Sequence, residues 1–185
     1  AILLSGQLKD YQLQRIATFL NPTADPLTTG YNVAQAKIAI GAGGFLGRGL
    51  GAGSQSQLRF LPESQTDFVF AVIAEEFGFV GVGIVLGAFM LLFSRMLFAA
   101  RVTRDAFAAY LLIGIAAAFF VQTLIHVGVN LAIMPATGVT LPLVSYGGSS
   151  LIMMLTMLGV AESVARRITP VDRLSVVHQN GTILK

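Results

Sequence analysis

The sequence predicts an all-α protein, a polytopic membrane helical bundle with a long extracytoplasmic loop that contains short helices. Of its 185 residues, 55% are hydrophobic and only 11% are charged, whereas charged residues make up about a quarter of a soluble domain. Three segments are long and apolar enough to cross a hydrocarbon layer of about 30 Å. The chain has no cysteine, which excludes disulfides and thiolate metal sites. Its basic residues are dispersed, so we expect no nucleic-acid binding.

The expected membrane helices cover residues 77–100, 106–127 and 149–165. The first contains the uncharged run Phe77–Ser94, and the second contains the uncharged run Ala106–Ile125. The third is rich in Leu and Met and ends before the pair Arg166-Arg167. Residues 1–5 are interpreted as the stub of a further helix. Because the chain opens without an initiator Met, we expect it to be the C-terminal part of a larger protein whose N-terminal bundle is missing.

The distribution of Lys and Arg predicts the orientation of the helices. Arg95, Arg101 and Arg104 lie around the connection between the first two helices, and further Arg residues follow the third. Short loops rich in Lys and Arg face the cytoplasm. We therefore expect residues 6–75 and 130–148 to be extracytoplasmic, and residues 166–185 to form a cytoplasmic tail.

The long outer segment contains an apolar stretch, Val33–Ile40, followed by a cluster of glycines between positions 41 and 53. Helical spacing of the apolar residues predicts a short interfacial helix that ends in the glycines. Glycine-rich backbone can direct N–H groups at an anion, and Lys37 and Arg48 flank this one. It does not match the P-loop pattern. A flexible re-entrant loop whose glycines allow tight packing at the bilayer surface is an equally good interpretation.

Two carboxylates, Glu63 and Asp67, precede the first membrane helix with a spacing of four residues. Pro62 predicts a helix that begins near Glu63, with Asp67 one turn further on the same face. Ionised groups beside membrane spans are functional candidates, although both acids would also suit a helix N-terminus. Glu76 is interpreted as such a cap, and the role of Glu75 stays open.

A second polar group lies at the outer end of the second helix. His126 and Asn130 are four residues apart and face a loop broken by Pro and Gly that contains Ser145. Such a loop is tolerated where it lines a cavity or packs within protein. One His and one Asn are too few for an all-protein metal site, so hydrogen bonding between helices is the favoured interpretation. Ser145 lacks the Gly-x-Ser-x-Gly context of a serine hydrolase.

Several motifs resemble the C-terminal half of the shape, elongation, division and sporulation (SEDS) family. They are Asp25-Pro26 with Gly30-Tyr31, Ile38-Ala39-Ile40-Gly41 with Gly43-Gly44, Leu61-Pro62-Glu63 with Thr66-Asp67, Glu75-Glu76, and Asn130 with Pro135, Gly138, Pro142 and Ser145-Tyr146-Gly147-Gly148-Ser149. Tyr11, Gln14-Arg15, Lys37 and Gln55–Leu58 look more like the rod-shape members than the division members. Gln65 stands where the family commonly has His, so no proton relay is expected there.

The resemblance implies a peptidoglycan glycosyltransferase of about ten spans that polymerises lipid II at the outer face of the bacterial cytoplasmic membrane. It implies a role in cell-wall elongation and rod shape, a class B penicillin-binding protein as partner, and a divalent cation, Mg or Mn, as cofactor. Asp67 matches the family's essential aspartate and would be the general base. Lys37, Arg48 and the cation would stabilise the leaving pyrophosphate. The other expected substrate-binding residues are Glu63, Glu75, His126, Asn130 and Ser145.

Three other functions are compatible with parts of the pattern. A division-specific polymerase of the same family is the nearest. A lipid-linked precursor flippase or transporter would also use broken helices beside polar residues, but it needs access from both faces, and the candidate residues lie mostly outside. A non-catalytic scaffold would leave Asp67 without a purpose. The piece of chain alone is expected to be inactive, because the missing spans complete the lipid-substrate groove in the family.

Overall fold

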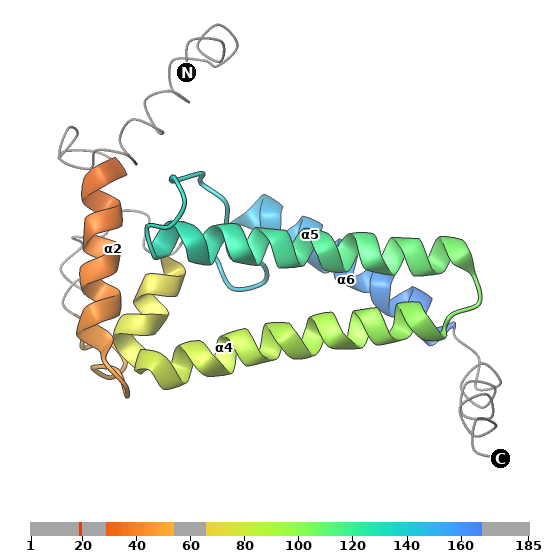
Figure 1. Cartoon of the computed structure of the whole chain (residues 1–185), viewed down its shortest axis with the longest axis horizontal. Helices are drawn as coiled ribbons and strands as arrows, with labels where there is room; N and C mark the ends of the chain where they lie inside the picture. Colours follow the sequence, from red (N-terminus) through yellow and green to blue (C-terminus); the bar gives the residue numbers. More distant parts are fainter. Residues whose placement is uncertain (1–18, 20–28, 54–65, 168–185) are drawn as a thin grey trace, which may run out of the picture. The chain divides into compact units, whose positions relative to one another are not determined.

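The computed structural model describes residue 19, residues 29–53 and residues 66–167 (Figure 1). Its helices are α2 (Thr29–Gly43), α4 (Val69–Val102), α5 (Ala106–Asn130) and α6 (Gly148–Arg166). Every regular element in these ranges is an α-helix, so the all-α prediction is confirmed. Among the described helices, α4, α5 and α6 are each long and apolar enough to cross a membrane.

Each expected membrane helix lies within one of these elements. Residues 106–127 and 149–165 match α5 and α6 closely, whereas residues 77–100 form only the later part of α4, which begins at Val69. The short helix expected around Val33–Ile40 is α2, and it ends among the glycines. The stub at residues 1–5 and the end of the tail, residues 168–185, lie outside the described residues.

One expectation about the acids is wrong. Residues 66–68 form a turn, and α4 begins only at Val69. Asp67 therefore precedes the helix instead of lying one turn inside it. Pro62 and Glu63 lie outside the described residues.

The chain divides into two compact units, and each is considered by itself. The first comprises residues 1–84 and 122–147. In it α2 runs beside the first turns of α4 (Figure 1), and the contact is formed by the buried side chains of Ala36, Ala39, Phe68 and Ala71. Three of these four residues are alanines, which lets the two helices approach closely.

A break at Gly78 separates the first turns of α4 from its membrane-spanning part. Gly78 has φ 64° and ψ −159°, a conformation that only glycine adopts without strain. In an uninterrupted helix the N–H groups of Phe79 and Val80 would donate to the carbonyls of Glu75 and Glu76. The break leaves these two donors and two acceptors without their helical partners.

The glycine loop, residues 44–53, supplies all four missing partners. The N–H groups of Phe79 and Val80 donate to the carbonyls of Gly44 (3.0 Å) and Phe45 (3.2 Å). In return the carbonyls of Glu75 and Glu76 accept from the N–H groups of Arg48 and Gly49, both at 3.0 Å. This exchange, called the clasp below, keeps these four backbone groups hydrogen-bonded, as burial near a membrane requires.

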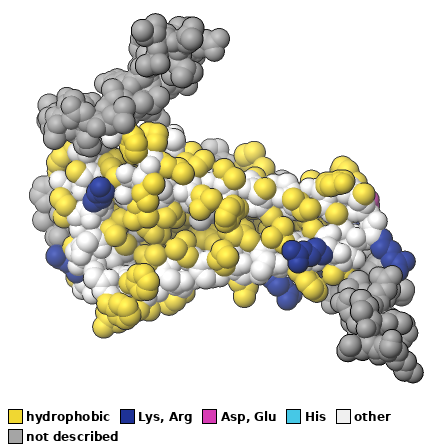
Figure 2. Space-filling model, in the orientation of Figure 1, with side chains coloured by type: hydrophobic (Ala, Val, Ile, Leu, Met, Phe, Trp, Pro, Cys, Tyr) yellow, Lys and Arg dark blue, Asp and Glu magenta, His cyan; other side chains and the backbone are white. Residues whose placement is uncertain are grey.

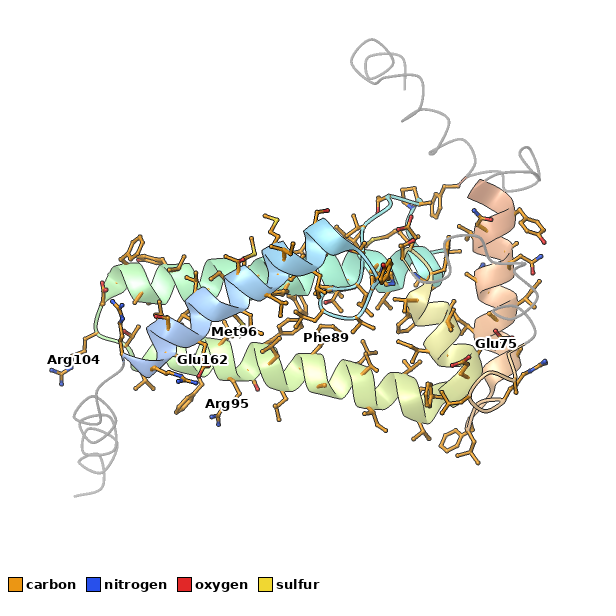
Figure 3. The ribbon with its side chains drawn as sticks, turned by 180° about the vertical axis from the view of Figure 1, so that it is seen from behind. Glu75, Phe89, Arg95, Met96, Arg104 and Glu162 are labelled. Atoms are coloured by element: carbon orange, nitrogen blue, oxygen red, sulfur yellow. The ribbon has the colours of Figure 1, made fainter. Side chains whose placement is uncertain are left out.

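The second unit comprises residues 85–121 and 148–185. Here Phe93 of α4 meets Phe120 of α5 edge to face, with ring centroids 5.5 Å apart. An apolar cavity of about 310 Å³ lies between the two helices. Arg95 and Arg104 lie toward the end of this unit at which α4 and α5 are joined (Figure 3).

The close approach of α2 to α4 predicts opposite effects for two glycines of α2. A β-carbon at Gly43 would collide with the carbonyl of Ala74, whereas one at Gly41 would meet nothing within 4 Å. Gly43→Ala should therefore destabilise the protein by about 1–3 kcal/mol, the usual cost of overpacking. Gly41→Ala, the matched control, should stabilise it by up to about 1 kcal/mol. Thermal unfolding of the full-length protein in detergent measures both, and equal midpoints for the two variants would contradict the packing described here.

Candidate functional site

Asp67 lies in the turn that leads into α4, and its side chain is partly buried. The first N–H groups of a helix have no partner within the helix, and the helix dipole favours a negative charge beside them. The first helical bond at this end runs from the N–H of Val72 to the carbonyl of Phe68, at 3.2 Å. The fold thus holds a carboxylate at a helix N-terminus without placing it inside the helix.

Asn130, at the end of α5, fixes the backbone around Asp67. Its Nδ2 group donates to the carbonyl of Asp67 (3.0 Å) and to that of His126 (2.9 Å). Its Oδ1 accepts from the N–H of Ala71 (3.2 Å), one of the groups left over at the start of α4. Both donors of the amide and its oxygen are used, and the residue is fully buried. Asn130 therefore caps a helix from outside it and holds Asp67 in register.

Ser145 holds the other side of the same turn. Its hydroxyl donates to the carbonyl of Thr66 (2.7 Å) and accepts from the N–H of Leu141 (2.7 Å). The hydroxyl is thus saturated by backbone groups, and the side chain is buried. Asn130 and Ser145 were expected to contact substrate. The geometry supports positioning of Asp67, and substrate contact by either stays a prediction.

One face of α5 carries the polar side chains that hold the loop at residues 131–147. Gln122, His126 and Asn130 are spaced by four residues, so they lie on one face of the helix. Gln122 donates to the carbonyl of Thr140 (3.0 Å), and the His126 ring bonds the carbonyl of Val139 (2.8 Å). Non-helical backbone beside a membrane span is tolerated when protein groups satisfy it, and these side chains do so.

The hydrogen-bond partner of the His126 ring shows which ring nitrogen carries the proton. A carbonyl only accepts, so Nδ1 carries the proton and donates to Val139. Nε2 is buried and has no hydrogen-bond partner in the part of the chain that the structure describes. The spacing of His126 and Asn130 suggested bonds between helices. Asn130 of α5 makes such a bond, because its Oδ1 accepts from the N–H of Ala71 in α4, whereas the His126 ring bonds the loop instead.

Asp67, His126 and the 131–147 loop come together around one carboxylate. The His126 ring bonds the carbonyl of Val139, the residue that follows Gly138. A β-carbon at Gly138 would lie 3.7 Å from Oδ2 of Asp67, so the loop passes beside the carboxylate at a residue without a side chain. Gly138 has φ 70°, which again favours glycine. At this point of the loop no side chain covers the carboxylate, because the residue beside it is Gly138.

The remaining acids have separate positions. Glu75 is fully buried and lies where the first part of α4 faces α2 (Figure 3). Glu76 does not cap a helix N-terminus as expected, because it is the eighth residue of α4. Its Oε1 accepts from the N–H of Gly51 (3.2 Å), so it adds a side-chain bond to the clasp. Glu63 lies outside the described residues.

The two basic candidates are exposed. Lys37 lies on α2 and Arg48 on the glycine loop, where Nε of Arg48 donates to the carbonyl of Ala42 (3.2 Å). Several glycine-loop N–H groups, those of Arg48, Gly49 and Gly51, bond to Glu75 and Glu76. They do not converge on an anion. The interpretation of the loop as tight packing is therefore supported over that of a phosphate cradle.

Sequence reasoning missed Gln122, Gly138 and the carbonyl of Val139. The spacing of four that selected His126 and Asn130 extends back to Gln122, so that signal was available. Gly138 and Val139 could not be recognised, because their role depends on how the 131–147 loop folds back over Asp67.

The family of cell cycle proteins that comprises FtsW, RodA and SpoVE matches residues 1–169. The peptidoglycan glycosyltransferase MrdB of Escherichia coli K12 is 46% identical over 157 residues, which are 85% of this chain and 42% of MrdB. A probable peptidoglycan glycosyltransferase FtsW of Trichlorobacter lovleyi is 44% identical over 150 residues, 81% of this chain and 39% of that protein. The chain thus spans less than half the length of these relatives.

Solved structures show the same fold. One belongs to a study of polymerization and crosslinking by a peptidoglycan synthase complex. It has a TM-score of 0.70 and 39% identity, and covers 90% of this chain and 45% of the other. The rod shape determining protein RodA of Thermus thermophilus, solved as an aspartate-to-alanine mutant, has a TM-score of 0.56 and 40% identity over 73% of this chain and 40% of RodA.

The bond from His126 to Val139 predicts how two substitutions will differ. An Asn amide reaches the position of Nδ1, so His126→Asn should keep the bond and remove the unpartnered Nε2, with stability close to that of the parent. His126→Leu should leave the buried carbonyl without a donor and cost about 1–3 kcal/mol. Thermal midpoints of the full-length protein in detergent distinguish the two. A Leu variant as stable as the Asn variant would show that the bond contributes nothing.

Proposed function

Because this chain belongs to the FtsW, RodA and SpoVE family of cell cycle proteins, we propose that the protein it forms is a peptidoglycan glycosyltransferase that polymerises lipid II. The observation that carries this proposal is the partly buried Asp67, whose backbone turn is fixed by Ser145 at the carbonyl of Thr66 and by Asn130 at the carbonyl of Asp67, and whose carboxylate lies beside Gly138. Elongation is the role we propose, on the likeness to rod-shape members, and division is the alternative.

The proposed task of Asp67 is general base catalysis. Its carboxylate accepts the proton of the acceptor sugar's 4-hydroxyl as that oxygen bonds to the anomeric carbon of the donor chain. The bond from that carbon to the undecaprenyl pyrophosphate breaks, and the pyrophosphate leaves with the electron pair. A base must be within hydrogen-bond reach of its proton, and fixing the backbone at Thr66 and Asp67 restricts where the carboxylate can point.

The reaction also requires that the negative charge developing on the leaving pyrophosphate is stabilised. Lys37 and Arg48 are the described cations we propose for it, since both are exposed. The bond from Nε of Arg48 to the carbonyl of Ala42 fixes the guanidinium group at the end of α2. Preorganised positive charge lowers the barrier where negative charge develops.

A divalent cation, Mg or Mn, is part of the proposal. Within the described ranges no three His, Asp or Glu side chains gather into a site, so these residues offer no all-protein cage. Mg²⁺ ordinarily binds through one or two carboxylates, water and substrate phosphates, so the substrate pyrophosphate would supply part of the ion's ligands. Such an ion would neutralise phosphate charge, and the proton transfer to Asp67 does not depend on it.

The described helices make this a membrane protein. We propose that it lies in the bacterial cytoplasmic membrane with Asp67 at the outer face, because the Arg-rich connection between α4 and α5 favours the cytoplasm. A class B penicillin-binding protein is the proposed partner, supported by the likeness to a synthase complex that joins polymerization to crosslinking.

The test is Asp67→Asn in the full-length protein, assayed with labelled lipid II. The amide keeps the shape but cannot take a proton, so polymerisation should fall by at least about 100-fold, within the range expected for a positioned base. Glu63→Gln should be milder. The matched control is Asp105→Asn, because Asp105 bonds the N–H of Phe107 at the start of α5 (3.0 Å) and serves as a cap.

Membrane insertion and partner binding should be unchanged in both Asn variants. Polymerisation by Asp67→Asn at the parental rate would refute the general-base role. Loss of activity in Asp105→Asn as well would point to a folding defect instead.

A further inference from the structure

We propose that the tip of the glycine loop, formed by Phe45, Leu46 and Leu50, inserts into the lipid leaflet beside the first turn of the membrane-spanning part of α4. These side chains are 69%, 78% and 78% exposed. Exposing three large apolar side chains of one short loop to water is unfavourable. A contiguous apolar patch of this kind on a membrane protein marks a contact surface.

The loop cannot fold back to bury these side chains. Its backbone is fixed to α4 by the four bonds of the clasp and by the bond from Gly51 to Glu76. Arg48 adds a bond to the end of α2. The tip is therefore a rigid projection, and whatever covers its apolar side chains must come from outside the loop.

Lipid is the occupant that the surroundings favour. The Phe45 ring stacks on Phe79 with centroids 5.8 Å apart, and Phe79 begins the part of α4 that follows the break. Phe79 and Ile84 are 67% and 68% exposed and belong to the uncharged run that spans the membrane. The apolar surface of the tip thus continues into the exposed apolar surface of α4, a helix long and apolar enough to cross a membrane. Figure 2 shows hydrophobic side chains gathered where the loop projects beneath α2.

The charges agree with this placement. Within the loop the exposed Arg48 is the basic residue, and long basic side chains keep their charged end at the polar interface while apolar neighbours enter the lipid. The acidic group beside the loop, Glu76, is partly buried and accepts the N–H of Gly51, so it is held against the loop backbone. An apolar tip with a cation behind it is the arrangement of an interfacial membrane anchor.

The test places a nitroxide at the tip of the full-length protein in nanodiscs of phosphatidylethanolamine and phosphatidylglycerol. Leu46→Cys carries the label, Met90→Cys on the exposed face of α4 gives the hydrocarbon reference, and Arg167→Cys after α6 gives the aqueous reference. Power-saturation spectroscopy measures collisions with oxygen, which dissolves in lipid, and with a nickel chelate, which stays in water.

We expect the ratio of oxygen to chelate collisions at Leu46 to approach the ratio at Met90 and to exceed that at Arg167. A ratio equal to that at Arg167 overturns the proposal, because the tip is then in water. Low collision rates with both reagents overturn it as well, because protein from elsewhere in the chain or from a partner then covers the tip. The outcome is independent of lipid II polymerisation, so it does not depend on the proposed activity.

Discussion

The exchange of backbone hydrogen bonds at Gly78 is the constraint on which the first unit depends. A helix that gives up two internal bonds near a membrane loses several kcal/mol unless the four freed groups find partners. Here the glycine loop returns all four, between residues 44–49 and residues 75–80. Because the partners are backbone atoms, the fit requires glycine at Gly43, Gly47 and Gly78, where a β-carbon would strike main-chain atoms. Two of the glycines that suggested a phosphate site, Gly43 and Gly47, are explained by this contact.

The same requirement shapes the site around Asp67. The 131–147 loop has little regular structure, yet its carbonyls at Val139 and Thr140 are bonded by His126 and Gln122, and the turn at Thr66 and Asp67 is bonded by Ser145 and Asn130. Side chains of α5 thus stabilise two irregular segments that meet at one carboxylate. The same residues bond the buried backbone carbonyls and position the proposed base. A substitution that removes these hydrogen bonds should therefore lower both stability and activity.

The helices could be predicted from the sequence, whereas contacts between residues far apart in the chain could not. Uncharged runs located the membrane helices, and a spacing of four brought out His126 and Asn130 on the correct face. The break at Gly78 was hidden, because a single glycine in an apolar run is common in membrane helices and its partners lie about thirty residues upstream. Asp67 was expected inside a helix, but it lies in the turn before α4, which begins at Val69, and there Asn130 from a distant part of the chain accepts from the N–H of Ala71.

Backbone hydrogen exchange at Arg48 and Gly49 in the full-length protein tests the clasp most directly. Both residues are exposed and lie outside any helix, and their N–H groups donate to the carbonyls of Glu75 and Glu76, so these bonds should slow the exchange of both amides. The account predicts exchange as slow as that of the amides of Phe79 and Val80, with all four released together when the unit opens. Exchange of Arg48 and Gly49 at the rate of an unstructured peptide would contradict it, even if Phe79 and Val80 stayed protected by the membrane.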